Sequence, residues 1–441
     1  MFFFLFGVTG WMAWDACIAG LDYYDSRYKP EYDPGFFFCL LFNWPLLVCN
    51  ILLIYLSTRV TLSFRIYLAY AVIIIACFLM PLVTEYLPKT MAWYALVPTV
   101  MLNGAGNSFV QGGMSGFASI FPPKYITALL VGQGVNGMLL NSVKMILLAI
   151  LPPDESLGAK DMNSFYDSLI FLSVFCVLFI ASTICFSILL KMDFAKERMK
   201  YVTYNQKQEE TEIDKILNNQ ARSNDSDLEE ENIDESPKGS LRANSSARAS
   251  YNTIEISDID DILRKEKQNE FYQVYKKILP LAIQNVIMFF ITFLVYPGTY
   301  LDTRFDMFDD SASSKAWSNI ILISVFSFGD TVGRFLAGPL KLFNSSNVIF
   351  LTVGRSIFIV TGMLVQVRAS PAWVFQTDLF RIVNIWLFAA TNGYNVGCLM
   401  LLGPQQVEEK HKERAGMIMA FHLTIGVCIG AIFAAFCMEK I

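Results

Sequence analysis

The sequence predicts an all-α, polytopic membrane protein with eleven transmembrane helices. Of its 441 residues, 54% are hydrophobic and only 17% are charged, whereas a soluble globular protein carries about a quarter charged residues. The apolar residues are gathered in long runs that short polar clusters separate. This distribution is typical of a chain that crosses a bilayer many times.

Each predicted helix rests on an apolar run long enough to cross the hydrocarbon core, which takes about 20 helical residues. Prolines punctuate these runs, as at Pro122-Pro123 between the fourth and the fifth. The eleven predicted spans are 1–21, 35–57, 65–86, 92–120, 125–151, 166–191, 276–299, 316–341, 347–368, 373–403 and 414–438.

A hydrophilic segment, 192–275, separates the sixth span from the seventh. It is rich in Glu, Asp, Asn, Ser and Lys, a composition that cannot bury a core, so we expect it to be largely disordered. A short amphipathic helix near 254–275 is compatible with the pattern. The segment divides the chain into an N-terminal six-helix bundle, 1–191, and a C-terminal five-helix bundle, 276–441.

Basic residues near the span ends predict the orientation. The short loops carry seven Lys and Arg on each side, so they do not decide it. The ends of the hydrophilic segment are basic, and we therefore expect 192–275 and the N-terminus in the cytoplasm, with the plasma membrane as the default location. The apolar start, MFFFLFG, indicates either an uncleaved signal anchor or a sequence that begins after a missing tail.

Several classes of function are not supported. The net charge of −5 gives no case for nucleic-acid binding. The nine cysteines lie inside apolar runs and show no metal spacing, so we interpret them as small buried hydrophobes. The chain lacks GxSxG, HExxH, P-loop and CxxC patterns. We expect no enzyme activity, no cofactor and no metal, and a monomer whose partners are a small solute and the lipid bilayer.

Polar residues inside the spans are the main indication of function, because each is costly in a bilayer unless it is paired or faces water. In the fourth span, five polar residues at intervals of four form one stripe: Asn103, Asn107, Gln111, Ser115 and Ser119. In the fifth span, Gln133, Asn141 and Lys144 share a face. Such residues either hydrogen-bond neighbouring helices or line a watery path, and a run of five favours the path.

The eighth and tenth spans repeat this pattern. Asp330 and Arg334 have the i, i+4 spacing of an intrahelical ion pair, which either neutralises itself or presents donors and acceptors to the hydroxyls of a polar solute. Ser327 precedes the pair on the same face. Asn395 is a further pathway candidate in the tenth span.

The first span carries Trp14 and Asp15 near its middle. An aromatic ring at this depth can stack on a flat solute. An aspartate there is paired, with Lys144 as a candidate partner, or protonated, or lines the path.

These residues resemble the signatures of the equilibrative nucleoside transporter family. Five stretches carry the resemblance, in order and on the expected spans: 10–15, 111–122 with 132–134, 328–334, 391–394 with 403–404, and 414–421. The resemblance implies a fold similar to the major facilitator superfamily with one helix fewer, and alternating access of two bundles around a midplane site.

The resemblance also implies roles for single residues. Gln111 would hydrogen-bond the edge of the base, and Trp14 would line the pocket beside it. Asp330 and Arg334 would hold the ribose. Arg355 matches an arginine of the ninth helix, with a structural or gating pairing.

Two departures from the first-helix signature bear on the mechanism. Ala13 replaces a proline, and Asp15 replaces an asparagine, which makes Asp15 a candidate for coupling transport to protons. The expected function is transport of nucleosides or nucleobases, either facilitative or proton-coupled. The alternatives are a facilitator of another polar or cationic solute, such as a biogenic amine, and a membrane receptor or enzyme subunit that transports nothing.

Overall fold

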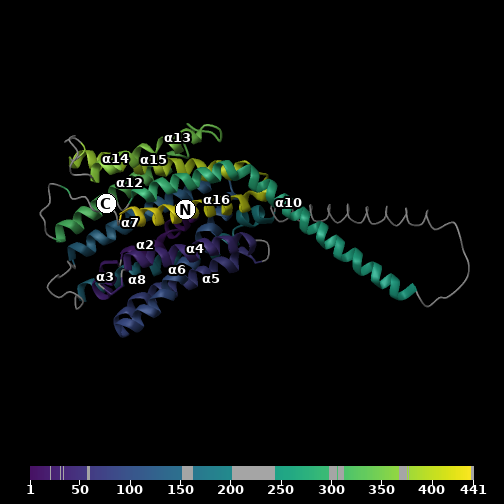
Figure 1. Cartoon of the computed structure of the whole chain (residues 1–441), viewed down its shortest axis with the longest axis horizontal. Coiled ribbons are helices and arrows are strands. Elements are labelled where there is room, and N and C mark those ends of the chain that lie inside the picture. The colour runs from purple at the N-terminus through teal and green to yellow at the C-terminus, as the bar shows by residue number, and fades with distance from the viewer. Residues whose placement is uncertain are drawn as a thin grey trace, which may run out of the picture. The chain divides into compact units, whose positions relative to one another are not determined.

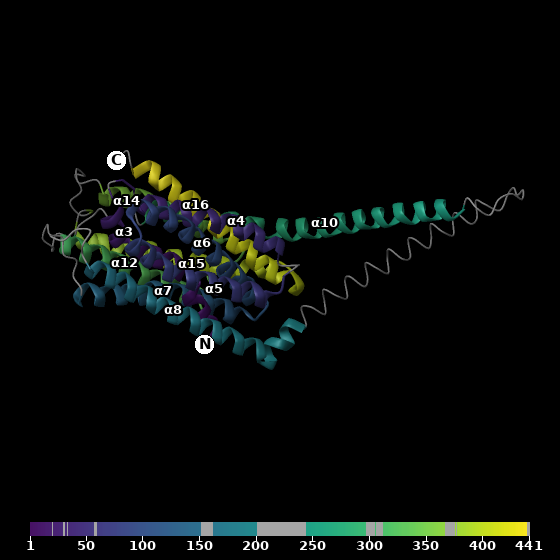
Figure 2. The ribbon, with the colours of Figure 1, turned by 90° about the horizontal axis from the view of Figure 1, so that it is seen from below.

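The computed structural model describes residues 1–19, 21–29, 31–32, 34–56, 60–150, 162–200, 244–296, 305, 312–366, 375 and 377–438. The chain forms two compact units. The first unit contains Met1–Met192 and Ile278–Ile441 and is a bundle of helices that run along a common axis in both views (Figures 1 and 2). The second unit, Asp193–Lys277, holds the hydrophilic segment.

Every predicted span overlaps helical residues. The helices are α1 (Phe2–Thr9), α2 (Met12–Ala19), α3 (Leu21–Tyr28), α4 (Pro34–Leu56), α5 (Leu62–Tyr86), α6 (Lys89–Ser119), α7 (Pro123–Ile150), α8 (Met162–Lys191), α10 (Asn244–Val295), α12 (Ala312–Leu336), α13 (Val348–Gly354), α14 (Ile357–Gln366), α15 (Asp378–Gln405), the 3-10 turn η3 (Glu409–His411) and α16 (Lys412–Met438).

Length and hydropathy qualify eight of these helical stretches as membrane spans in the described part of the chain. They correspond to α5, α7, α8, the Glu270–Val295 part of α10, the Trp317–Leu336 part of α12, α13 with α14, α15 and α16. A shorter apolar helix, Leu40–Leu56, lies in α4. The protein is therefore an all-helical, multi-span membrane protein.

The first predicted span is not one continuous helix. It is broken between α1 and α2 at Gly10 and Trp11, where the Gly10 N–H donates to the Gly7 carbonyl oxygen at 2.9 Å instead of continuing the i→i−4 ladder. Glycine inside a helix costs about 1 kcal/mol relative to alanine, so a break is cheapest here. The break lies against α7, since a Cβ atom added to Gly10 would meet Gln133 Nε2 at 3.4 Å.

The ninth predicted span is also interrupted. Between α13 and α14 the Ser356 N–H donates to the Val353 carbonyl oxygen at 2.9 Å, a 3-10-type bond. Arg355 lies at this interruption and is only 1% exposed, so its guanidinium points into the bundle. A stretch of 3-10 geometry inside a helix often marks a hinge or a point of local strain.

The hydrophilic segment is helical toward its end. Helix α10 begins at Asn244 and includes both the last part of this segment and the seventh predicted span. The short helix predicted near 254–275 falls inside α10. The predicted disorder of 201–243 lies outside the described residues, so that part stays a prediction.

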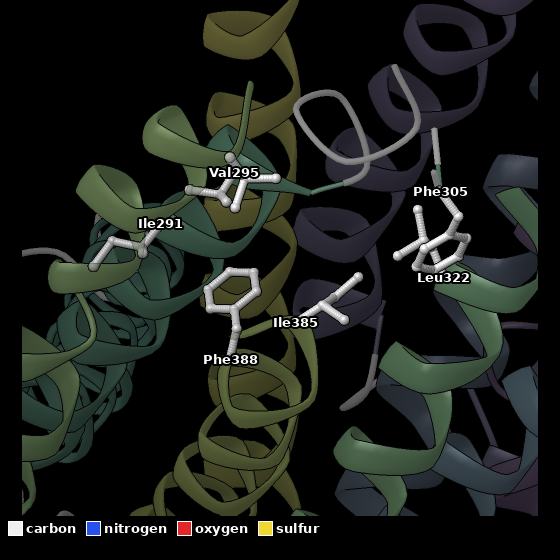
Figure 3. Close-up of a cluster of buried hydrophobic side chains, with 7 residues drawn as sticks. Ile291, Val295, Phe305, Leu322, Ile385 and Phe388 are labelled. Carbon is white, nitrogen blue, oxygen red and sulfur yellow. The ribbon is translucent and has the colours of Figure 1, made fainter. Parts of the chain in front are cut away.

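A hydrophobic cluster binds α10, α12 and α15 together in the second half of the chain (Figure 3). The Phe388 ring lies 6.1 Å from the Phe326 ring of α12 and 5.2 Å from the Phe358 ring of α14, both of which pack against the cluster. The buried members are Ile291, Val295, Phe305, Leu322, Val365, Ile385 and Phe388. This cluster fixes the three helices that carry most of the polar site described next.

The two halves of the membrane unit also meet directly. Helix α7 packs against α12, and α4 and α6 pack against α16. Arg65, at the start of α5, donates to Glu413, at the start of α16, at 3.4 Å, and the Arg65 side chain is 3% exposed. This ion pair joins the ends of two helices that lie 348 residues apart in sequence.

Candidate functional site

Asp330 and Arg334 form the predicted ion pair on α12. Arg334 Nε donates to Asp330 Oδ2 at 2.6 Å, and both side chains are less than a tenth exposed. Their i, i+4 spacing places them one turn apart on one face of the helix. The pair therefore lies inside the bundle, where a charged hydrogen bond is stronger than in water.

Gln133 of α7 accepts a second hydrogen bond from Arg334, from the other half of the chain. Arg334 Nη1 donates to Gln133 Oε1 at 2.9 Å. Since a guanidinium carries five N–H donors, donors remain on Arg334 for the hydroxyls of a bound solute. Gln133 thus belongs to the same cluster as the ion pair, a contact that the polar stripe of the fifth span did not predict.

A chain of hydrogen bonds leads from Asp330 to Arg355. Asn392 of α15 donates from Nδ2 to Asp330 Oδ1 at 2.7 Å, and its Oδ1 accepts from the Thr292 hydroxyl at 2.7 Å. Arg355 Nη2 then donates to Thr292 Oγ1 at 3.0 Å. The carboxylate of Asp330 is therefore held on both oxygens, by Arg334 directly and by Arg355 through two neutral side chains.

Arg355 is held mainly by neutral groups. Besides Thr292, its guanidinium donates to the Met288 and Phe388 carbonyl oxygens at 3.3 and 3.5 Å and lies over the Phe388 ring at 5.0 Å. No carboxylate lies within salt-bridge distance of it among the described residues. A buried cation without an ion pair is costly, and the hydrogen-bond chain to Asp330 is its route to a counter-charge.

The sequence missed two members of this chain. Thr292 is a lone hydroxyl in an apolar run, and Asn392 lies in a stretch that carried the family resemblance but received no role. Neither spacing nor composition marks them, because their partners lie 63 and 62 residues away. Only the packing of α10, α12 and α15 reveals them.

Gln111 and Trp14 lie apart from this hydrogen-bond network. Gln111 of α6 is 2% exposed, and its Oε1 has no hydrogen-bond partner among the described residues. The Trp14 ring packs on Phe42 of α4, with centroids 5.0 Å apart. The base-binding roles that the resemblance implies for these two residues stay predictions.

Asp15 and Lys144 do not pair with each other, so that candidate pairing is wrong. Asn136 Nδ2 donates to Asp15 Oδ2, and Lys144 forms an ion pair with Asp167 of α8. Lys144 follows Asn136 by eight residues, which is about 12 Å along α7. At that distance along the helix, the Lys144 side chain reaches Asp167 of α8 and not Asp15.

The remaining candidates fall on two interfaces. Asn141 Nδ2 donates to Ser327 Oγ at 3.1 Å, so these two candidates, which the sequence did not pair, join α7 to α12. Asn395 instead donates to Thr352 Oγ1 at 3.1 Å and lies between α15 and α13. The structure therefore places Asn141 and Ser327 at the interface of α7 with α12, whereas no hydrogen bond in the described part of the chain joins Asn395 to Asp330 or Arg334.

The fold and this site define a multi-span membrane protein with a buried polar cluster where its two halves meet. The fold resembles solved major facilitator transporters over nearly the whole chain: the structure of FucP in its outward conformation gives a TM-score of 0.55 at 10% identity, covering 99% of this chain and 94% of that one. A structure of a D-xylose–proton symporter gives 0.55 at 12% identity, with 100% and 96% covered. At such identities the likeness concerns the fold alone.

The family follows from the sequence comparisons. The family model for nucleoside transporters matches residues 97–439. Among relatives, the chain is 24% identical to equilibrative nucleotide transporter 1 of Arabidopsis thaliana, over 98% of this chain and 84% of that protein, and 23% identical to equilibrative nucleoside transporter 1 of Homo sapiens, over 88% and 79%. The chain belongs to the nucleoside transporter family, and it is a transporter rather than an enzyme.

Proposed function

We propose that this chain carries nucleosides across a membrane by alternating access of two bundles, six spans in 1–191 and five in 276–441, around the Asp330–Arg334 pair. The bond between Arg334 and Gln133 carries this proposal, because it joins the two bundles at a buried polar site. A solute that takes over these donors and acceptors binds one arrangement of the bundles better than the other, which is what shifts a conformational equilibrium.

The distribution of contacts between the halves supports alternating access. The Arg65–Glu413 ion pair closes the bundles at the ends where α5 and α16 begin. With the N-terminus and 192–275 in the cytoplasm, as the basic residues favour, this closed end faces the cytoplasm. The sugar hydroxyls of a nucleoside suit the free donors of Arg334 and the remaining lone pairs of Asp330. We propose a monomer in the plasma membrane.

The test is uptake of labelled adenosine, inosine, uridine and hypoxanthine by purified protein in proteoliposomes. We expect saturable uptake of nucleosides that is accelerated by unlabelled nucleoside on the opposite side, because only a carrier exchanges solute in this way. Binding without such exchange would identify a receptor. If monoamines block adenosine uptake completely, and at lower concentrations than unlabelled nucleosides do, the protein is a biogenic amine facilitator instead.

Asp15 favours coupling of transport to protons as a second property of this site. Its carboxylate accepts a hydrogen bond from Asn136. No salt bridge reaches Asp15 from the described residues. A carboxylate in a membrane interior without a cationic partner is stabilised by taking up a proton.

Substitution of Asp15 by Asn tests the coupling. If Asp15 takes up a proton on the side from which solute enters, wild-type uptake rises as the pH on that side falls, because protonation loads the carrier. We expect Asp15→Asn to abolish this dependence and to leave uptake nearly constant between about pH 5.5 and 8. Proteins are usually most stable in this range, so unfolding does not disturb the comparison. The measurement is initial uptake against external pH, with exchange at equal pH as the control for folding. An unchanged pH profile contradicts the coupling.

A further inference from the structure

A cavity of about 290 Å³ lies between the interrupted ninth span and α15. It is lined by residues before α13, on both sides of the interruption and on α15, among them Phe343, Phe350, Gly354, Arg355, Phe358 and Thr391. The phenylalanine rings make most of the wall apolar. Pockets for small molecules range from about 300 to 1,000 Å³, so this cavity has room for part of a single-chain molecule but not for a whole two-chain lipid.

The cavity opens toward the lipid. Only 28% of the ninth span is buried, the lowest share among the eight stretches that qualify as membrane spans. Phe350 on this span is 75% exposed, and Leu387, one turn before Thr391 on α15, is 45% exposed. A Cβ atom added to Gly354 would meet nothing within 4 Å. Because these residues belong to membrane-spanning helices, a molecule dissolved in the bilayer can enter the cavity sideways.

Arg355 gives the wall of the cavity a positive charge. Its Nε donates to the Thr391 hydroxyl at 3.4 Å. Its other three hydrogen bonds go to the Thr292 hydroxyl and to the carbonyl oxygens of Met288 and Phe388. A guanidinium has five N–H donors, so one N–H of Nη1 makes no hydrogen bond to the described residues. Neutral groups are thus the only hydrogen-bond partners of this buried cation in that part of the chain.

The charge and the apolar wall together select the chemistry of an occupant. A buried cation without a counter-charge is costly. A carboxylate beside Arg355 would supply that charge through a charge-assisted hydrogen bond, which is strong where water is excluded. The phenylalanine wall suits an acyl chain, which needs no polar partners. A fatty acid is a single-chain component of a bilayer that carries both groups.

We propose that this cavity binds a fatty acid from the surrounding bilayer. The carboxylate lies against the Arg355 guanidinium and the Thr391 hydroxyl, and the chain lies along Phe350 and Phe358. Arg355 also begins the hydrogen-bond chain that ends at Asp330, so the bound anion competes with this chain for the guanidinium. Binding depends only on the membrane location of the protein and is independent of nucleoside transport.

Crosslinking with a photoreactive fatty acid tests this site. Purified full-length protein in phosphatidylcholine vesicles is illuminated with a long-chain fatty acid that carries a diazirine on its chain, at alkaline pH so that the carboxyl group is ionised. We expect mass spectrometry to find the label between residues 343 and 358. Unlabelled oleate should compete at concentrations about tenfold lower than methyl oleate, because the ester has no charge to pair with Arg355.

A matched pair of tryptophan substitutions locates the binding. Gly354→Trp directs a ring into the cavity from a position where a Cβ atom has open space, and it should remove the label from this segment. Val360→Trp changes another lipid-exposed position of the same span, 58% exposed, that does not line the cavity, and it should keep the label. The competition needs only wild-type protein, so it gives a result even if Gly354→Trp does not fold.

Three results would overturn the fatty acid site. Equal competition by oleate and methyl oleate would show ordinary contact with acyl chains. Stronger competition by phosphatidylserine than by oleate would show that the occupant is a phospholipid. Label that lies outside 343–358, or that persists in folded Gly354→Trp as it does in Val360→Trp, would show that the fatty acid binds elsewhere. None of these results bears on uptake of nucleosides by the wild-type protein.

Discussion

Uptake by Arg334→Ala is expected to fall about 100-fold in Vmax/KM at normal amounts of protein in the membrane. Arg334 is the only group that bonds both Asp330 and Gln133 among the described residues. Removing one partner of a buried, hydrogen-bonded charge pair costs about 2–5 kcal/mol, because the other charge stays buried and unpaired. Here that loss falls on the site proposed to hold the sugar, so we expect it to appear in transport.

The matched variants separate charge from geometry. Arg334→Lys keeps the positive charge but loses the planar fork that reaches two partners at once, so we expect a loss of about tenfold. Arg381→Ala removes another arginine that pairs with an aspartate on its own helix, at 3.0 Å from Asp378 on α15, and should change uptake less than threefold. Labelled adenosine uptake, normalised to membrane protein, gives the comparison. Uptake by Arg334→Ala equal to that of wild type would exclude the ribose-holding role.

Parts of this site could be predicted from local spacing alone. Asp330 and Arg334 lie one turn apart, so their pairing follows from helix geometry without knowledge of the fold. The eleven apolar runs likewise predict helices because a bilayer leaves the backbone few other ways to satisfy its hydrogen bonds. The stripe on the fifth span marked Gln133 as a polar residue that needs a partner inside the bundle, but it did not identify Arg334 as that partner.

Other parts depend on packing between helices that are distant in sequence. The chain from Asp330 through Asn392 and Thr292 to Arg355 joins three helices and the turn after α13, and no periodicity within one helix encodes it. The same holds for Lys144, whose charge suggested Asp15 but whose position along α7 brings it to Asp167. Sequence shows which residues need partners inside a membrane, and the fold decides which partners they obtain.

Gly393→Ala is expected to abolish transport and to lower the melting temperature by several degrees. A Cβ atom at Gly393 would lie 1.9 Å from the Asp330 carbonyl oxygen and 2.8 Å from the Arg334 amide nitrogen. Both obstacles are backbone atoms, so α12 and α15 must separate, whereas a flexible side chain could have moved aside. Overpacking of this kind costs about 1–3 kcal/mol, and the separation also stretches the 2.7 Å bond from Asn392 to Asp330.

A series of three glycines tests whether contact with backbone is the cause. Gly403 meets the flexible Met419 side chain at 2.7 Å, and Gly354 has nothing within 4 Å. We therefore expect Gly403→Ala to retain most uptake and Gly354→Ala to retain all of it, with a small gain in stability because alanine favours helix over glycine by about 1 kcal/mol. Melting temperature and adenosine uptake are measured on all three. If Gly393→Ala behaves like Gly354→Ala, α12 and α15 are not in backbone contact at Asp330, and the positioning of that carboxylate by α15 is wrong.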